Sequence, residues 1–346
     1  MNQQSKGQKL AKALVAIGAM TLVGSAYAAE YRTHFATAGT LGENIFSSDI
    51  KPGSFVGIGY KQASIDTLAD GSGNKITSLP GGIPLAFKNE ASVKYLYAGF
   101  TSQEQYAGGN ITASVVLPFT SSDKLVAAGP FPRYGVTTAQ SLPNSSANFK
   151  NKLDDIEVGT SWDYKKSENT KYSVGLALTT KTGDYHVEGN GSSVGPGYYT
   201  LKPSFASITQ DGALSYAYKA ALVLNTNNSV GNYRTGNMLS LEAAVGYKTS
   251  VGAFGLKVHA LRQYQDDTGG GVTANSPNPW VATSGVSKPQ ADGQRTSYNT
   301  ATIYYTVPVK PIESLFYVGL STMKRPAYTQ VPNTGFFEMR LTKAFN

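Results

Sequence analysis

The stretch that decides the fold is LSLEAAVGYK, residues 239–248. Every second side chain is apolar, from Leu239 to Tyr247, and Glu242 lies on the opposite face. Alternation with a period of two predicts a β-strand that has one apolar and one polar face. In a soluble sandwich the apolar face would be buried and Glu242 would meet water. In a membrane barrel the apolar face would meet lipid and Glu242 would face the lumen.

The same alternation recurs along the chain and predicts twelve strands, with fourteen as the alternative. The predicted strands are 54–64, 92–102, 110–118, 153–164, 171–182, 198–208, 213–224, 237–247, 253–265, 296–307, 312–323 and 335–345. Most run 10 to 13 residues, longer than the strands of about 5–6 residues common in globular proteins and closer to the roughly 9–11 of tilted membrane strands.

The connections between these strands alternate between long and short. Short ones hold turn residues, as Asp211-Gly212 does, whereas long ones such as 266–295 are rich in Gly, Pro, Asn and Ser. An up-and-down barrel with short periplasmic turns and longer outer loops has this rhythm. The fold class is therefore predicted to be all-β: a single antiparallel transmembrane β-barrel with both termini on the periplasmic side.

The N-terminus has the layout of a cleaved secretory signal peptide, residues 1–28. Three lysines precede an apolar run of 11 residues, ALVAIGAMTLV, and an A-x-A site ends at Ala28. The barrel domain is predicted to be residues 29–346. The signal holds three lysines and no acids, so the net charge falls from +8 to +5 on cleavage. That mild excess, without a basic stripe, does not indicate nucleic-acid binding.

Other features favour the outer membrane of a Gram-negative bacterium. No segment after the signal approaches 18 consecutive apolar residues, which excludes a helical membrane protein, and cysteine is absent. Tyrosines near strand ends suit an interfacial girdle. The last stretch, GFFEMRLTKAFN (335–346), resembles the C-terminal strand that the outer-membrane assembly machinery recognises. Outer-membrane lipid and lipopolysaccharide are the expected surroundings. A lipid-facing acid would cost on the order of 2 kcal/mol, so Glu242 is expected to face the lumen.

The stretch 224–267 resembles the outer-membrane transporter family of the meta-pathway of phenol degradation, a relative of the long-chain fatty-acid transporter barrels. The pattern that carries the resemblance is Asn225-Thr226, Tyr233-Arg234-Thr235-Gly236, Gly246-Tyr247 and Gln263-Tyr264-Gln265-Asp266. The resemblance implies a β-barrel that moves hydrophobic, often aromatic, compounds across the outer membrane. It implies no particular substrate residues.

Charged residues on the polar faces of the strands are the candidate lumen-lining residues, expected to tune selectivity and not to perform chemistry. They are Asp155, Glu157, Glu242, Lys257, His259, Glu338 and Arg340. No catalytic residue, cofactor or metal site is predicted. A barrel lipid hydrolase would need a His–Ser pair beside lipid, whereas His259 lies on the polar face.

Pro203 falls inside the predicted strand 198–208 and removes one hydrogen bond from its ladder. One interpretation is a kink in the wall through which cargo leaves sideways into the membrane. The other is a bulge at a strand end.

These observations predict an outer-membrane channel or transporter for small hydrophobic solutes, aromatic ones included, that is not an enzyme. The alternatives are a general diffusion porin, an outer-membrane lipid hydrolase and a structural or adhesive barrel.

Overall fold

The computed structural model describes most of the chain after residue 51. The described residues are 52–65, 68–69, 75–79, 83–128, 140–141, 147–185, 194–229, 233–266, 268–269, 295, 297–327 and 335–345. The predicted signal peptide, residues 1–28, lies outside them, so its cleavage and the domain boundary at residue 29 stay predictions.

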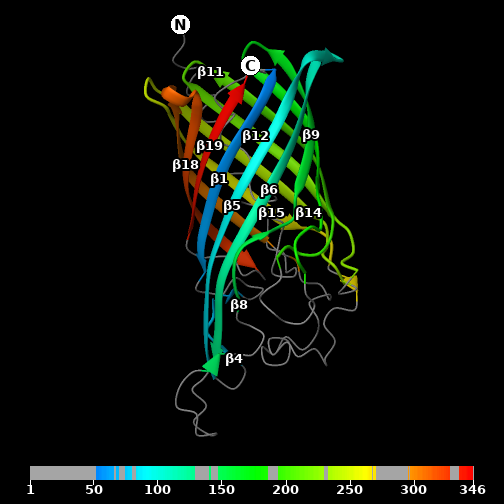
Figure 1. Ribbon diagram of the computed structural model, residues 1–346, viewed down its shortest axis with the longest axis vertical. Coiled ribbons are helices and arrows are strands. Elements are labelled where there is room, and N and C mark those ends of the chain that lie inside the picture. The colour runs from blue at the N-terminus through cyan, green and yellow to red at the C-terminus, as the bar shows by residue number, and fades with distance from the viewer. Residues whose placement is uncertain are drawn as a thin grey trace.

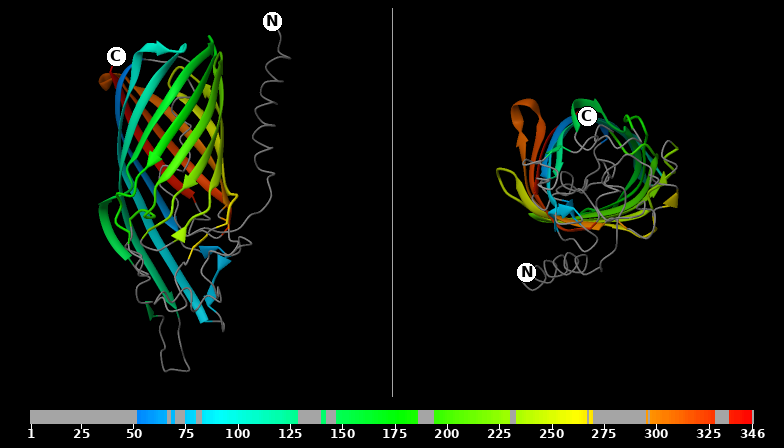
Figure 2. Two further views of the ribbon diagram at one scale, coloured as in Figure 1. Left: turned by 90° about the vertical axis from the view of Figure 1, so that its right-hand side faces the viewer. Right: turned by 90° about the horizontal axis from the view of Figure 1, so that it is seen from below.

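Twelve antiparallel strands form a closed barrel, because the first strand pairs with both its sequence neighbour and the last strand. Figure 1 shows the tilted strands from the side, and Figure 2 shows the ring along the barrel. The strands are β1 Gly53–Ile65, β5 Ile83–Tyr106, β6 Gly109–Ala128, β9 Glu157–Ser167, β10 Thr170–Thr179, β11 Thr200–Asp211, β12 Leu214–Asn225, β14 Met238–Lys248, β15 Ala253–Gln263, β17 Ser297–Val309, β18 Ser314–Ala327 and β19 Gly335–Phe345.

Each predicted strand corresponds to one of these twelve, which confirms the fold class and the number twelve. The predicted bounds differ most for β5 and β6, where the sequence predicts the shorter strands 92–102 and 110–118. Both continue past the barrel rim (Figure 1), where they pair with each other, and β4 (Ser78–Leu79) and β8 (Ala147–Leu153) add to their free edges. The pairing partners come from distant segments, so local alternation did not reveal this extension.

Short strands outside the barrel lie in the long loops. β13 (Tyr233–Arg234) pairs with β16 (Thr268–Gly269), and β2 (Leu68–Ala69) pairs with β3 (Lys75–Ile76). β7 (Gln140–Ser141) adds to β6. One short 3-10 helix, η4 (Lys310–Ile312), makes the turn between β17 and β18. None of the described residues forms a helix long and apolar enough to cross a membrane.

The two ends of the barrel differ as the sequence predicts. At the short-turn end, the five connections are residues 107–108, 168–169, 212–213, 249–252 and 310–313. Gly108 and Gly212 adopt φ angles of 78° and 62°, a left-handed conformation that glycine adopts without steric cost. All the long connections leave from the opposite end, the long-loop end.

The barrel has an apolar outer face. Ile303 and Leu320, on neighbouring strands β17 and β18, are 71% and 65% exposed. Outward aromatic rings stand near the short-turn end, among them Tyr247 and Phe254, whose centroids are 5.9 Å apart. A soluble protein rarely leaves so large an apolar surface in water. The outer face is therefore suited to lipid.

Candidate functional site: the barrel lumen

The quoted strand shows which side chains face the lumen. In β14, Glu242 is 3% exposed and Ser240 is buried as well, whereas Tyr247 on the other face is exposed. Partner strands continue the alternation, because Glu242 lies opposite His259 on β15 and Lys219 on β12. The polar face of the alternation is the inward face of the barrel.

Seven inward-facing titratable residues form a lumenal belt: Lys61, Lys219, Glu242, Lys257, His259, Glu338 and Arg340. They are coupled electrostatically across the barrel. Lys257 interacts with Glu242 and Glu338, and Lys61 interacts with the same two acids although its strand is distant from β14 in the ring. The belt is therefore one electrostatic unit and not a set of separate pairs.

The C-terminal strand brings two of the predicted residues together. Arg340 Nε lies 3.6 Å from Glu338 Oε1, and Tyr95 Oη donates a hydrogen bond of 3.0 Å to the same carboxylate oxygen. The Arg340 guanidinium lies over the Tyr317 ring, 4.2 Å from its centroid. Charge pairing and cation–π contact together hold the guanidinium against the wall.

Glu157 belongs to a separate group farther around the ring. Its carboxylate makes an ion pair with Lys202 on β11 and accepts a 3.0 Å hydrogen bond from Thr179 Oγ1. Nearer the short-turn end, Asp163 accepts hydrogen bonds from Thr112 and Ser161. These contacts satisfy inward-facing carboxylates that would otherwise be costly to bury.

Asp155 lies outside the regular strands, in the break between β8 and β9. Its buried carboxylate accepts a 2.7 Å hydrogen bond from the backbone N–H of Gly183, in the long loop after β10. Gly195 of the same loop approaches this carboxylate so closely that a side chain there would overlap it. Asp155 thus attaches a loop to the barrel rim.

His259 Nε2 lies 2.9 Å from Ser240 Oγ, and the His259 ring packs edge-on against Tyr298 at 5.6 Å. The serine and the histidine are both buried on the inward face. The pair therefore lies away from the lipid face that a membrane-lipid hydrolase would use. Among the described residues, no group of three His, Cys, Asp or Glu side chains could hold a metal ion.

Four tyrosine side chains lie over glycines on the inward face. Gly59 lies beneath Tyr95, Gly57 beneath Tyr97, Gly255 beneath Tyr304 and Gly319 beneath Tyr317. In each case a Cβ at the glycine would overlap the tyrosine side chain. Glycine therefore allows each ring to cover the neighbouring backbone, so that aromatic faces cover part of the lumen wall.

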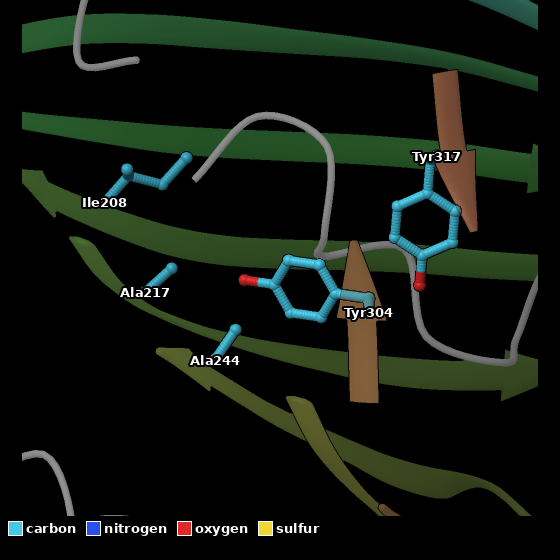
Figure 3. Close-up of a cluster of buried hydrophobic side chains, with 5 residues drawn as sticks. All are labelled: Ile208, Ala217, Ala244, Tyr304 and Tyr317. Atoms are coloured by element: carbon cyan, nitrogen blue, oxygen red, sulfur yellow. The ribbon is translucent and has the colours of Figure 1, made fainter. Parts of the chain in front are cut away.

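An apolar collar covers one side of the lumen wall, from β11 to β18, between the belt and the short-turn end. It consists of Ile208, Ala217, Ala244, Tyr304 and Tyr317, all buried. In Figure 3, Tyr304 points from β17 toward Ala217 and Ala244, and its hydroxyl donates a 3.3 Å hydrogen bond to the carbonyl of Val245. Along β14, Ala244 follows Glu242 toward the turn, which places the collar beyond the belt.

Pro203 interrupts the pairing between β11 and β12. The pairs run from Leu201↔Leu224 to Ser204↔Ala221, and the two between them, at Lys202 and Pro203, are missing. The register is the same on both sides, so the strand has no bulge here. Pairing with β10 is continuous through Pro203↔Leu176. The missing N–H of proline therefore weakens only one seam of the wall.

Asn225, Arg234 and Gln263 of the family motif lie in a polar node at the long-loop end, whereas Gly246-Tyr247 lies near the short-turn end. Thr200 Oγ1 donates to Asn225 Oδ1 at 2.7 Å, and Asn237 Oδ1 accepts from the Asn225 backbone N–H at 2.9 Å. Arg234 Nε donates to the Asn225 carbonyl, and Gln263 Nε2 donates to the Gln265 carbonyl. These hydrogen bonds join the ends of neighbouring long loops.

Several lumenal residues were not among the predicted candidates. They are Lys61, Asp163, Lys202, Lys219 and the four tyrosines that cover glycines. The charged ones could have been found, because each lies on the polar side of an alternating strand, as Lys61 does opposite Ile58. The tyrosines could not, because a tyrosine suits either face of a membrane strand.

The chain is similar to one known family and to solved outer-membrane barrels. Residues 65–286 match the model of the family described as "Putative MetA-pathway of phenol degradation". No curated protein matches. Among solved structures, an outer membrane channel from Pseudomonas putida F1 is 12% identical, with 89% of this chain and 100% of that chain covered and a TM-score of 0.65. That likeness shows a shared barrel fold.

Two more distant barrels score lower. The KdgM porin is 10% identical, covers 84% of this chain and 99% of its own, and has a TM-score of 0.39. The Pseudomonas putida toluene transporter TodX is also 10% identical, with 85% and 89% covered and a TM-score of 0.41. Neither score is high enough to bear on function.

Proposed function

This chain belongs to the family of the MetA-pathway of phenol degradation, and from that premise we propose that it is an outer-membrane channel for small hydrophobic compounds, aromatic ones included. The proposal places the mature barrel, from about residue 29, in the outer membrane of a Gram-negative bacterium. Its surroundings would be lipid and lipopolysaccharide, and the assembly machinery would insert it through the C-terminal strand.

The observation that carries the proposal is the apolar collar. Ile208, Ala217, Ala244 and two tyrosines succeed the charged belt along the lumen. An apolar lining opposes wetting and so disfavours ions and sugars, whereas a hydrophobic solute exchanges contact with water for contact with the collar. Twelve strands also enclose a narrow lumen.

The proposed role of the belt residues Glu242, Lys257, His259, Glu338 and Arg340, and of Glu157, is to tune selectivity. Asp155 would act indirectly, through its loop. We propose no catalytic role for the chain, and we interpret Ser240 and His259 as a wall contact, because both lie on the inward face.

A general diffusion porin is the second candidate, and the charged belt favours it. Rings of charged side chains line water-filled pores. The two candidates differ in what the collar does, because a porin would conduct sugars past it.

The test is solute uptake into lipopolysaccharide-containing vesicles that carry the refolded protein, with protein-free vesicles as the control. We expect benzyl alcohol to enter faster with the protein and sucrose to stay outside. Tyr304→Ala removes the collar ring that points toward Ala244. The collar should then oppose wetting less, so sucrose entry should rise several-fold. Free passage of sucrose through the unmodified protein would instead identify a porin.

A further inference from the structure

We propose that the lumen holds a binding site for aromatic carboxylates, formed by β1, β18 and β19 and facing a wall of small residues. This inference rests on the proposed channel function and specifies its substrate class. The site would hold the carboxylate among the cations of the belt and the ring against the aromatic side chains beside them.

The first support is the charge of the belt. Among its described residues, four are cations (Lys61, Lys219, Lys257 and Arg340), two are acids (Glu242 and Glu338), and His259 completes the set. The cations act on one another: Lys257 is repelled by Lys61 and by Arg340. An anion that enters this region therefore meets more attraction than repulsion.

The second support is that the cations lie on aromatic rings. Lys61 Nζ is 4.1 Å from the centroid of Phe336, and the Arg340 guanidinium carbon is 4.2 Å from that of Tyr317. Tyr317 in turn stacks on Tyr304 with centroids 5.8 Å apart. A ligand with a ring next to a carboxylate matches this arrangement, because its carboxylate can meet the cation while its ring meets an aromatic face.

The third support is the opposite wall. In the ring of twelve strands, β11 lies diametrically across from β19, and β12 across from β1. Their inward residues near Lys202 and Lys219 are small: Ser204, Ala206 and Ala221. Lys61 and Phe336 face inward and are partly exposed, and 12% of the Arg340 side chain is exposed, so this surface opens to the lumen.

The two acids of the belt have neighbouring partners. Glu338 is held by Arg340 and Tyr95, and Glu242 lies beside Lys219 and His259. Each acid is thus offset by a neighbouring cation, and the belt keeps a net positive charge that can attract a carboxylate.

The experiment uses single-channel recording on the full mature protein with gradients of four salts. Sodium benzoate and benzylammonium chloride have similar shape and opposite charge. Sodium cyclohexanecarboxylate removes the aromatic ring and keeps the charge, and potassium chloride gives the baseline. Isothermal titration of benzoate into detergent-folded protein supplies a second readout that does not depend on conductance.

We expect benzoate to permeate better than benzylammonium, and to bind more tightly than cyclohexanecarboxylate. Lys61→Gln should reduce the benzoate preference several-fold, and Phe336→Leu should reduce the difference between benzoate and cyclohexanecarboxylate. Lys343→Gln is the matched control, because Lys343 is on β19 like Phe336 but at an outward position. It should change neither readout.

Equal permeation of benzoate and benzylammonium, or equal binding by the Lys61→Gln variant, would overturn the site while leaving the channel proposal intact. Failure of the channel proposal looks different: benzyl alcohol would then enter vesicles no faster with the protein than without it.

Discussion

At the scale of single residues, the packing of the lumen wall depends on tyrosines that lie over glycines. Tyr304 lies over Gly255 on the adjacent strand, and Tyr317 lies over Gly319. Glycine is thus required at these positions for lack of space, although it weakens a strand elsewhere.

Gly255→Ala tests this requirement. The added Cβ would overlap the Tyr304 ring and the Val245 carbonyl, so we expect a loss of about 1–3 kcal/mol in unfolding free energy. The measurement is urea unfolding in detergent micelles. Gly159→Ala is the control, since the nearest neighbour of its Cβ would be Ser114 Oγ, at 3.2 Å. Equal effects of the two substitutions would show that the ring does not need the glycine.

At the scale of strands, the seam between β11 and β12 is interrupted. Two successive pairs are missing at Lys202 and Pro203, and the same register resumes after them. Lys202 is nevertheless held by its ion pair with Glu157. The proposal that cargo leaves sideways through this seam remains open to a direct test.

Pro203→Ala restores the missing N–H opposite Leu222. One new ladder hydrogen bond should stabilise the barrel by about 0.5–1.5 kcal/mol. If cargo leaves through the seam, uptake of benzyl alcohol should also fall. The measurements are urea unfolding and vesicle uptake, with Pro308→Ala near the end of β17 as the control. Higher stability with unchanged uptake would remove the sideways route and leave passage along the lumen.

At the scale of the whole molecule, the barrel reverses the usual distribution of polarity. Charged side chains such as Glu242 and Lys257 are buried inside, while Ile303 and Leu320 are exposed outside. This arrangement is stable only if lipid covers the outer face, because water would otherwise contact a continuous apolar band. Closure of β1 on β19 leaves the barrel no unpaired edge, as a bilayer requires.

Ile303→Arg tests the lipid contact. Ile303 lies at the middle of β17, so a charge there should reach the bilayer midplane and cost about 2–4 kcal/mol. Folding into lipid vesicles over a urea series measures the loss. Val251→Arg is the control, because Val251 is 67% exposed but lies in a short turn. A similarly small effect at both positions would contradict a lipid-facing β17.

The sequence alone determined the fold class, the twelve strands and the inward side of Glu242, because alternation is a local property with a period of two. Turn residues such as Asp211-Gly212 also act locally, so the rhythm of the loops could be predicted. Only the tertiary structure decided which residues meet. The Lys61–Glu338 contact across β1 and β19, the Ser240–His259 pair, the collar around Tyr304 and the node at Asn225 join positions far apart in the chain. Such contacts depend on register and barrel closure, which no local pattern encodes.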